Sequence, residues 1–166
     1  MRMINKALLA ASIPAIAIAA PAQAQVGGGK MNGVVAPVCE VSDLFASISF
    51  PSMTAGSEIN DGLSLQCNDG DGAEVTLTSS EGGMESDDNE DLEIEYTATL
   101  TSAALAAPLV LDTTGAFNND VSASATISGS EALANGISGN LNVTLNESAV
   151  WAGGYADTIT VQLTAS

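Results

Sequence analysis

The sequence predicts an all-β fold, a sandwich of antiparallel sheets, and three observations indicate it. Short runs alternate apolar and polar residues with a period of two, as strands do when one face lies on a core. Stretches rich in turn-forming residues separate these runs, at Asn68–Gly72, Glu81–Gly83 and Asn135–Gly136. Aromatic residues make up only 4% of the chain, so we expect a core built mainly from Val, Leu, Ile and Ala. Short strands joined by such turns are typical of a two-sheet sandwich.

The alternating runs are expected to form the strands. In chain order they are residues 46–50, 63–67, 75–77, 94–100, 123–127, 141–145 and 155–166. The last run is the most regular, because Ile159, Val161, Leu163 and Ala165 alternate with polar side chains. Residues 103–107 could form a helical turn, which Pro108 would end. The chain shows no fixed-period repeat and no second domain.

The N-terminus has the organisation of a secretory signal peptide. Arg2 and Lys6 precede the apolar run Ala7–Ala20, and Ala22–Ala24 is a small-x-small cleavage site. The alternative, a membrane helix, is disfavoured because the run is too short to span a bilayer comfortably. We therefore expect a signal peptide at 1–24, an N-terminal extension at 25–38 and one domain at 39–166, with no membrane insertion after cleavage.

The chain has two cysteines, Cys39 and Cys67, and both lie in the exported part. In an oxidising compartment they are expected to form a disulfide. A reactive thiol or a metal ligand is the alternative. The chain has no histidine, and two cysteines alone do not make a zinc site.

Composition and charge exclude several classes of function. Without histidine, the chain cannot build a Ser-His-Asp or Cys-His catalytic arrangement. After signal cleavage Lys30 is the only Lys or Arg, against 20 acidic residues, and such a surface repels nucleic acid and anionic lipid. The sequence therefore predicts no catalytic residue, no metal site, no cofactor and no enzymatic activity.

Several of these features occur together in one known family. They are the signal peptide, Cys39, a second cysteine at Cys67 in a Leu-x-Leu-x-Cys strand, a later Ile-x-Tyr strand at Ile94 and Tyr96, and the closing segment Gly153–Leu163. With them the chain resembles the spore coat protein U domain family, which includes the subunits of archaic chaperone–usher pili. The resemblance covers about residues 39–166. It is most specific in the closing Gly-x-Tyr-x-Asp followed by an alternating strand.

The resemblance implies an immunoglobulin-like sandwich that lacks one strand and is completed by a donated strand. A periplasmic chaperone would lend that strand first, and the extension of a like subunit would then replace it at an usher. The implied donor residues are Met31, Val34, Val35, Ala36 and Val38. The implied groove-edge residues on the C-terminal strand are Tyr155, Asp157, Ile159, Val161 and Leu163. The disulfide would join the first two strands.

Function follows from that resemblance as an expectation. The chain would be a structural subunit that passes through the periplasm to a pilus on the cell surface, where it serves adhesion or biofilm formation. The composition of the extension is unfavourable for a donor strand, because Gly27–Gly29, Gly33 and Pro37 weaken a strand. A secretion tail without a structural role is therefore the alternative for that segment. Two other functions stay open: a self-complete secreted coat or matrix protein, and a hydrolase built on two facing carboxylates.

Two smaller features have alternative interpretations. The stretch Glu81–Glu95 holds eight carboxylates and Asn68–Glu74 is also acidic, so each is either a solvated loop or a calcium site. Trp151 and Tyr155 flank the last turn. We expect them to cap the sandwich core, with an exposed aromatic pair for binding a sugar or a surface as the alternative.

Overall fold

The structure, a computed structural model, describes residues 28–88 and 92–166. The chain divides into two units, Met1–Val34 and Val35–Ser166. The described part of the first unit has no helix or strand, and the expected signal peptide at 1–24 lies outside the described residues. The elements of the second unit are β1 (Cys39–Ser42), β2 (Glu58–Cys67), β3 (Ala73–Ser79), β4 (Met84–Ser86), β5 (Glu93–Ile94), β6 (Tyr96–Ser102), β7 (Leu109–Asp112), β8 (Val121–Ile127), α1 (Glu131–Asn135), β9 (Ile137–Leu145), β10 (Tyr155–Ala156) and β11 (Ile159–Ala165).

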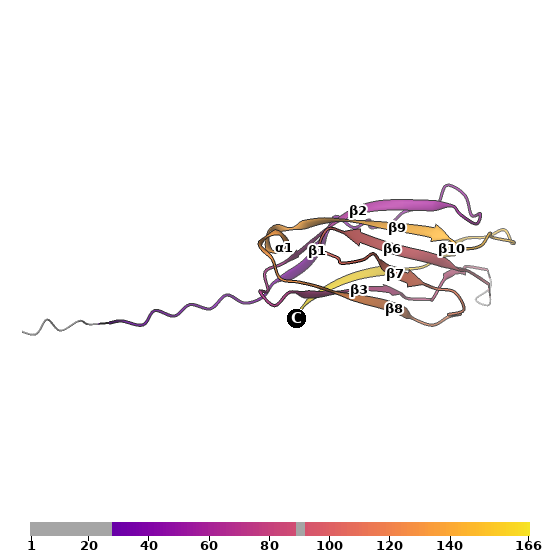
Figure 1. Cartoon of the computed structure of the whole chain (residues 1–166). Coiled ribbons are helices and arrows are strands. Elements are labelled where there is room, and N and C mark those ends of the chain that lie inside the picture. The colour runs from indigo at the N-terminus through magenta and orange to yellow at the C-terminus, as the bar shows by residue number, and fades with distance from the viewer. Residues whose placement is uncertain (1–27, 89–91) are drawn as a thin grey trace, which may run out of the picture. The chain divides into compact units, whose positions relative to one another are not determined.

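The second unit is an antiparallel β-sandwich, as the alternation predicts (Figure 1). One sheet has the strand order β1-β2-β9-β6-β7, and the facing sheet has the order β11-β3-β8. A short third sheet, β10-β4-β5, extends one end. Every strand pair is antiparallel. The all-β sandwich class is therefore confirmed.

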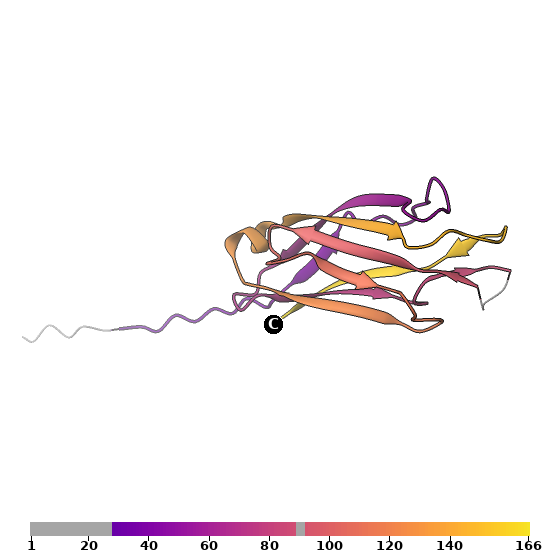
Figure 2. The same cartoon turned by 45° about the vertical axis from the view of Figure 1, so that its right-hand side comes forward.

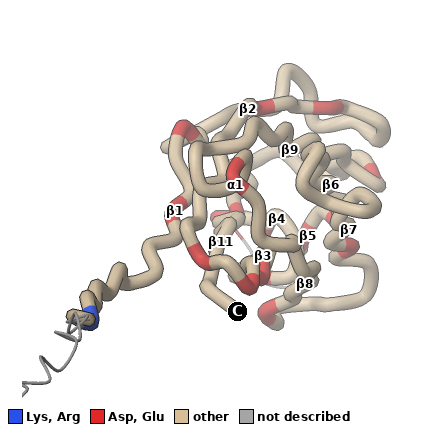
Figure 3. Tube along the Cα trace, turned by 60° about the vertical axis from the view of Figure 1, so that its left-hand side comes forward, with Lys and Arg blue, Asp and Glu red and all other residues tan. Residues whose placement is uncertain are grey.

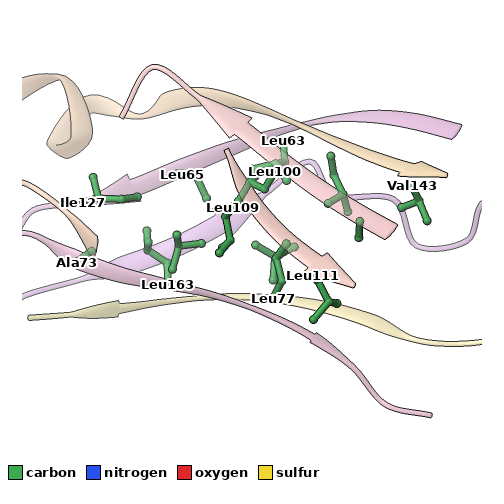
Figure 4. Packing of buried hydrophobic residues seen from close by; sticks show 14 of the residues in the cluster. Leu63, Leu65, Ala73, Leu77, Leu100, Leu109, Leu111, Ile127, Val143 and Leu163 are labelled. Atoms are coloured by element: carbon green, nitrogen blue, oxygen red, sulfur yellow. The ribbon is translucent and has the colours of Figure 1, made fainter. Parts of the chain in front are cut away.

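The core lies between the two main sheets, where the inward residues of each alternating run meet (Figure 4). In β3 every second residue from Ala73 to Ser79 is buried, as a period of two requires. Full burial of each such aliphatic side chain stabilises the fold by about 1.5–3 kcal/mol relative to exposure. The largest fully buried side chains are Tyr96, Leu65, Leu77, Ile94, Leu100, Leu111, Leu133, Leu141 and Leu145.

The sandwich has two distinct ends, which Figures 1 and 2 show on opposite sides of the domain. The base end holds the start of β1, the turn 68–72, α1 and the C-terminus, where Ser166 N donates to Gly72 O at 3.2 Å. The tip end holds the loops 51–57 and 146–154 together with residues 87–88, and they are joined by hydrogen bonds such as Ala149 N to Met53 O at 2.9 Å. β2 runs from tip to base over ten residues, a length of about 30 Å.

The structure differs from the sequence prediction in several elements. Residues 46–50 alternate like a strand but form none, because no described strand lies beside them to complete a ladder. The run 155–166 is two strands, since β10 pairs with β4 and β11 pairs with β3 in a different sheet. Residues 103–107 contain turns and bends rather than a helix. β4, β7 and α1 were not predicted.

Candidate functional site

A groove opens along one seam of the sandwich, between the segment Phe45–Phe50 and the segment Tyr155–Ile159. Its volume is about 410 Å³. Ile59, Met84, Tyr96 and Val143 form the rest of its described lining. Toward the base the seam is closed because β1 lies next to β11. The groove thus lies beside the segment that connects β1 to β2.

One rim of the groove is the outer edge of the C-terminal strands. β11 pairs with β3 on one side only, and no described strand pairs with its other side. Tyr155, Asp157 and Ile159 are half-buried, and Val161 and Leu163 are buried, so all five predicted edge residues lie on the inward face. The exposed residues of β11 are Thr160, Gln162 and Thr164, and none of them is charged. An edge without charged residues is the kind that readily accepts another strand.

The other rim, Phe45–Phe50, is irregular chain with a bend at Ala46, and it has no ladder partner among the described residues. The Phe45 backbone N–H donates to Asp61 Oδ2 of β2 at 2.8 Å, which fixes the beginning of this rim. Phe45 and Phe50 pack against the core, whereas Ile48 is 36% exposed. Residues 46–50 therefore have the alternation of a strand but form none, since no described strand pairs with them.

Asp157 lies at the middle of the rim Tyr155–Ile159 and accepts several hydrogen bonds there. Its Oδ2 accepts hydrogen bonds from Ser79 Oγ at 2.5 Å and from Tyr96 Oη at 2.6 Å. Its Oδ1 accepts hydrogen bonds from Ser80 Oγ at 3.0 Å, from the Glu81 N–H at 3.2 Å and from the Thr158 N–H at 2.6 Å. Ser79 and Tyr96 are buried, so this carboxylate satisfies two donors that water does not reach. The cluster ties β3, β6 and the β10–β11 junction together.

The phenol of Tyr96 is held in its neutral form by this arrangement. Burial raises its pKa above the ordinary value of 10.0, and the hydrogen bond to the Asp157 carboxylate raises the pKa further. A neutral phenol can donate to Asp157, whereas a phenolate beside that carboxylate would be repelled. Sequence reasoning placed Asp157 at the groove edge and Tyr96 in a strand. It did not predict that they meet.

Asp157 is the only carboxylate among the described lining residues of the groove. A hydrolase of the kind weighed from the sequence needs two facing carboxylates. The lining does not supply that pair, and the single carboxylate accepts five hydrogen bonds from the protein itself. The other described lining residues are apolar or carry a hydroxyl group.

The candidate donor residues divide between the two units. Met31 and Val34 belong to the first unit and are almost fully exposed. In the second unit, Val38 is held by Asn68: the Val38 N–H donates to Asn68 Oδ1 at 2.7 Å, and the Asn68 N–H donates to Val38 O at 3.2 Å. Asn68 Nδ2 also donates to Ala36 O at 3.4 Å. Residues 36–38 are therefore tied to their own domain.

The predicted disulfide is present between Cys39 and Cys67. These residues are directly opposite each other in the antiparallel pair of β1 and β2. The bridge thus fixes the start of β1, immediately after the residues that Asn68 holds.

The expectation that Trp151 caps the core is wrong, because its side chain is 64% exposed at the tip. The loop that carries it turns outward before Gly153, whose φ of 152° redirects the chain. Tyr155 does pack against the core, and its hydroxyl donates to Trp151 O at 3.1 Å. The two aromatic residues are therefore linked but face different surroundings.

Acidic residues are spread over the sandwich, and Lys30 in the extension is the described basic residue (Figure 3). Within residues 28–88 and 92–166, no three acidic or cysteine side chains gather closely enough to hold a metal ion. Part of the acidic stretch Glu81–Glu95, residues 89–91, lies outside the described residues. In the described part of the chain, no helix is long and apolar enough to cross a membrane.

In comparisons with known proteins, no protein-family model and no curated protein matches the chain.

Proposed function

We propose that the domain is a structural subunit that accepts a β-strand in its groove, and that the strand comes from the N-terminal extension of another copy. One observation carries the proposal. The groove separates the unpaired outer edge of Tyr155–Ile159, which comprises β10 and the first residue of β11, from a segment with strand-like alternation that has no ladder partner among the described residues, Phe45–Phe50. A strand inserted there would add backbone hydrogen bonds to the edge Tyr155–Ile159, and its alternate side chains would fill the groove.

The extension has the length and charge to be that strand. The groove rim Tyr155–Ile159 spans about 13 Å, and residues 28–35 reach about 26 Å when extended. Residues 39–166 contain no Lys or Arg, whereas the extension contains Lys30, so an extension is attracted to an acidic domain that repels other domains. Because the second unit begins at Val35 and residues 36–38 are held by Asn68, the inserted part is the stretch before Val35, which contains Met31 and Val34.

Assembly by such strand exchange corresponds to the pilus subunit that the sequence resemblance implies. In that role a periplasmic chaperone would fill the groove before assembly and an usher would guide the exchange. The product would be a surface fibre that serves adhesion or biofilm formation. The alternative of a self-complete coat or matrix protein predicts a stable monomer whose groove needs no strand.

The test compares the mature chain, residues 25–166, with a variant that begins at residue 36. We expect denaturant-resistant polymers from the first and none from the second, measured by size-exclusion chromatography with light scattering. A synthetic peptide of residues 25–35 should bind the shortened variant and raise its Tm. A stable monomer in both cases, with no peptide binding, would establish the self-complete alternative.

A matched pair of substitutions locates the site of insertion. Ile48→Asp places a charge in the groove lining, outside any strand of the fold. Val110→Asp places the same charge on β7, on a side chain that is exposed and does not line the groove. We expect only Ile48→Asp to abolish peptide binding and polymer formation, while both variants keep the circular dichroism of the parent.

A further inference from the structure

Exposed apolar side chains gather at both ends of the domain. A single exposed apolar residue is ordinary on a protein surface, whereas exposed apolar residues that gather in one place mark an interaction site. Val35 and Val38 lie next to the base end and are 84% and 59% exposed. Val150 and Trp151 lie at the tip end and are 84% and 64% exposed. The two pairs are on opposite ends of the same sandwich (Figure 1).

The tip pair is presented by a loop that is held on both sides. Before the pair, the Ala55 N–H donates to Ser148 Oγ at 2.8 Å, and Ala149 N–H donates to a carbonyl of the loop 51–57. After the pair, the Gly154 N–H donates to Asp87 Oδ1 at 2.9 Å, and the Asp87 N–H donates to Gly154 O at 3.0 Å. The loop that carries the two exposed side chains is thus held on both sides, and Trp151 lies four residues before Tyr155 in the groove rim.

The direction of an inserted strand brings the two pairs together. β11 runs from the tip to the base, so a strand that pairs with it in antiparallel fashion ends at the tip. The residues that follow the inserted stretch, Val35 to Val38 of the incoming copy, then leave the groove beside Trp151. A parallel strand would end at the base, where the accepting copy's own extension begins, and would place two bases against each other.

Charge limits how neighbouring copies can attract each other at this junction. Residues 39–166 hold all 20 acidic residues and no Lys or Arg, so two domains repel each other. The free energy gained from an apolar contact does not depend on charge, and it is proportional to the apolar surface that the contact removes from water.

We propose that Val150 and Trp151 of one copy pack against Val35 and Val38 of the next copy, and so form a second, heterologous contact beside the inserted strand. The partner is a like subunit, and the proposal rests on the strand exchange proposed above. A heterologous contact repeats from copy to copy without closing, as a fibre requires.

The intrinsic fluorescence of the mature chain tests this contact, because Trp151 is its one tryptophan. In the variant that begins at residue 36, with a shorter peptide of residues 25–34 bound, the groove is filled but neither Val35 nor Val38 of a neighbouring copy is present. We expect red-shifted emission and ready quenching by acrylamide. In polymers of the intact mature chain we expect blue-shifted emission and several-fold weaker quenching.

Val38→Ser probes the other side of the contact, with Val110→Ser as its matched control. Polymers of Val38→Ser should still form, since residue 38 lies outside the inserted stretch, but their Trp151 should be more accessible than in Val110→Ser polymers. Polymers with a fully accessible Trp151 would overturn the contact and leave strand exchange standing. Absence of any polymer would overturn strand exchange, and the contact with it.

Discussion

Asp157→Ala removes the acceptor that links three parts of the sandwich, and its effect on stability follows from two buried donors. The hydroxyls of Ser79 and Tyr96 both donate to Asp157 Oδ2, and both residues are at most 1% exposed. Each buried donor that loses its partner costs about 1–3 kcal/mol, so the pair gives a loss of about 2–6 kcal/mol. The other donors, from Ser80, Glu81 and Thr158, are less buried and can turn to water. We therefore count only the buried pair.

The assay is denaturant unfolding of the mature chain, followed by far-ultraviolet circular dichroism because Trp151 is too exposed to report on the core. For a domain of this size, at about 3–4 °C per kcal/mol, the loss corresponds to a fall in Tm of roughly 6–24 °C. Asp112→Ala is the matched control. Asp112 is an exposed carboxylate that also accepts hydrogen bonds, from the hydroxyl and the N–H of Thr114 and, at 3.5 Å, from Asn146 Nδ2, but these donors are themselves open to water.

We expect the control to lose less than about 1 kcal/mol, as surface substitutions usually do. If Asp157→Ala loses no more stability than Asp112→Ala, then the hydroxyls of Ser79 and Tyr96 find other partners. The Asp157 cluster would then not be what stabilises the link between β3, β6 and the β10–β11 junction.

Three further predictions concern the core and the base. Because the pKa of Tyr96 is raised in the fold, the contribution of its neutral phenol to stability is complete below the ordinary pKa of 10.0 and is lost as the pH rises above that value. Urea unfolding above pH 10 should therefore show a free energy of unfolding that falls more steeply with pH in the parent than in Tyr96→Phe. Replacing Cys39 and Cys67 with serine should lower the free energy of unfolding by about 3–4 kcal/mol, since their separation of 28 residues sets the closed loop; unfolding curves unchanged by reduction would contradict this. Gly72→Ala should prevent folding or lower Tm strongly, because its φ is 107° and a Cβ would overlap the carbonyl oxygen of the last residue of β8, whereas Gly56→Ala, with a φ of 80° and open space around it, should cost about 1 kcal/mol.

The sequence predicts the strands well where the signal is local. The alternation in 63–67, 75–77, 123–127 and 141–145 places each run in a strand with the expected residues inward. The helix α1 was missed because five residues are too few to show a helical period, although Ser130 at its start accepts a hydrogen bond from the Leu133 N–H. Ser130 followed by Glu131 was a signal that could have been used.

Pairing could not be predicted in the same way, because it depends on residues far apart in the chain. Residues 46–50 carry a strand pattern as clear as that of 75–77, yet only the latter has neighbours on both sides. Asp157 receives hydrogen bonds from Ser79 and Tyr96, which are 78 and 61 residues away. Asp157 has the same phase as Tyr155 and Ile159 in the alternation, and a carboxylate on that inward face requires buried donors. The pattern could therefore have indicated a polar cluster, although not its members.

The distribution of charge is consistent with selective rather than general association at the open edge. An unpaired strand such as β11, without a charged outward residue, would ordinarily invite edge-to-edge pairing between any two copies. Two whole domains, however, bring all of their carboxylates together when they approach, and that repulsion opposes lateral pairing. An extension brings no carboxylate, carries Lys30 and is only one strand wide. Under the proposed strand exchange, the acidity that opposes contact between two domains does not oppose insertion of the extension, since residues 25–38 have no negative side chain.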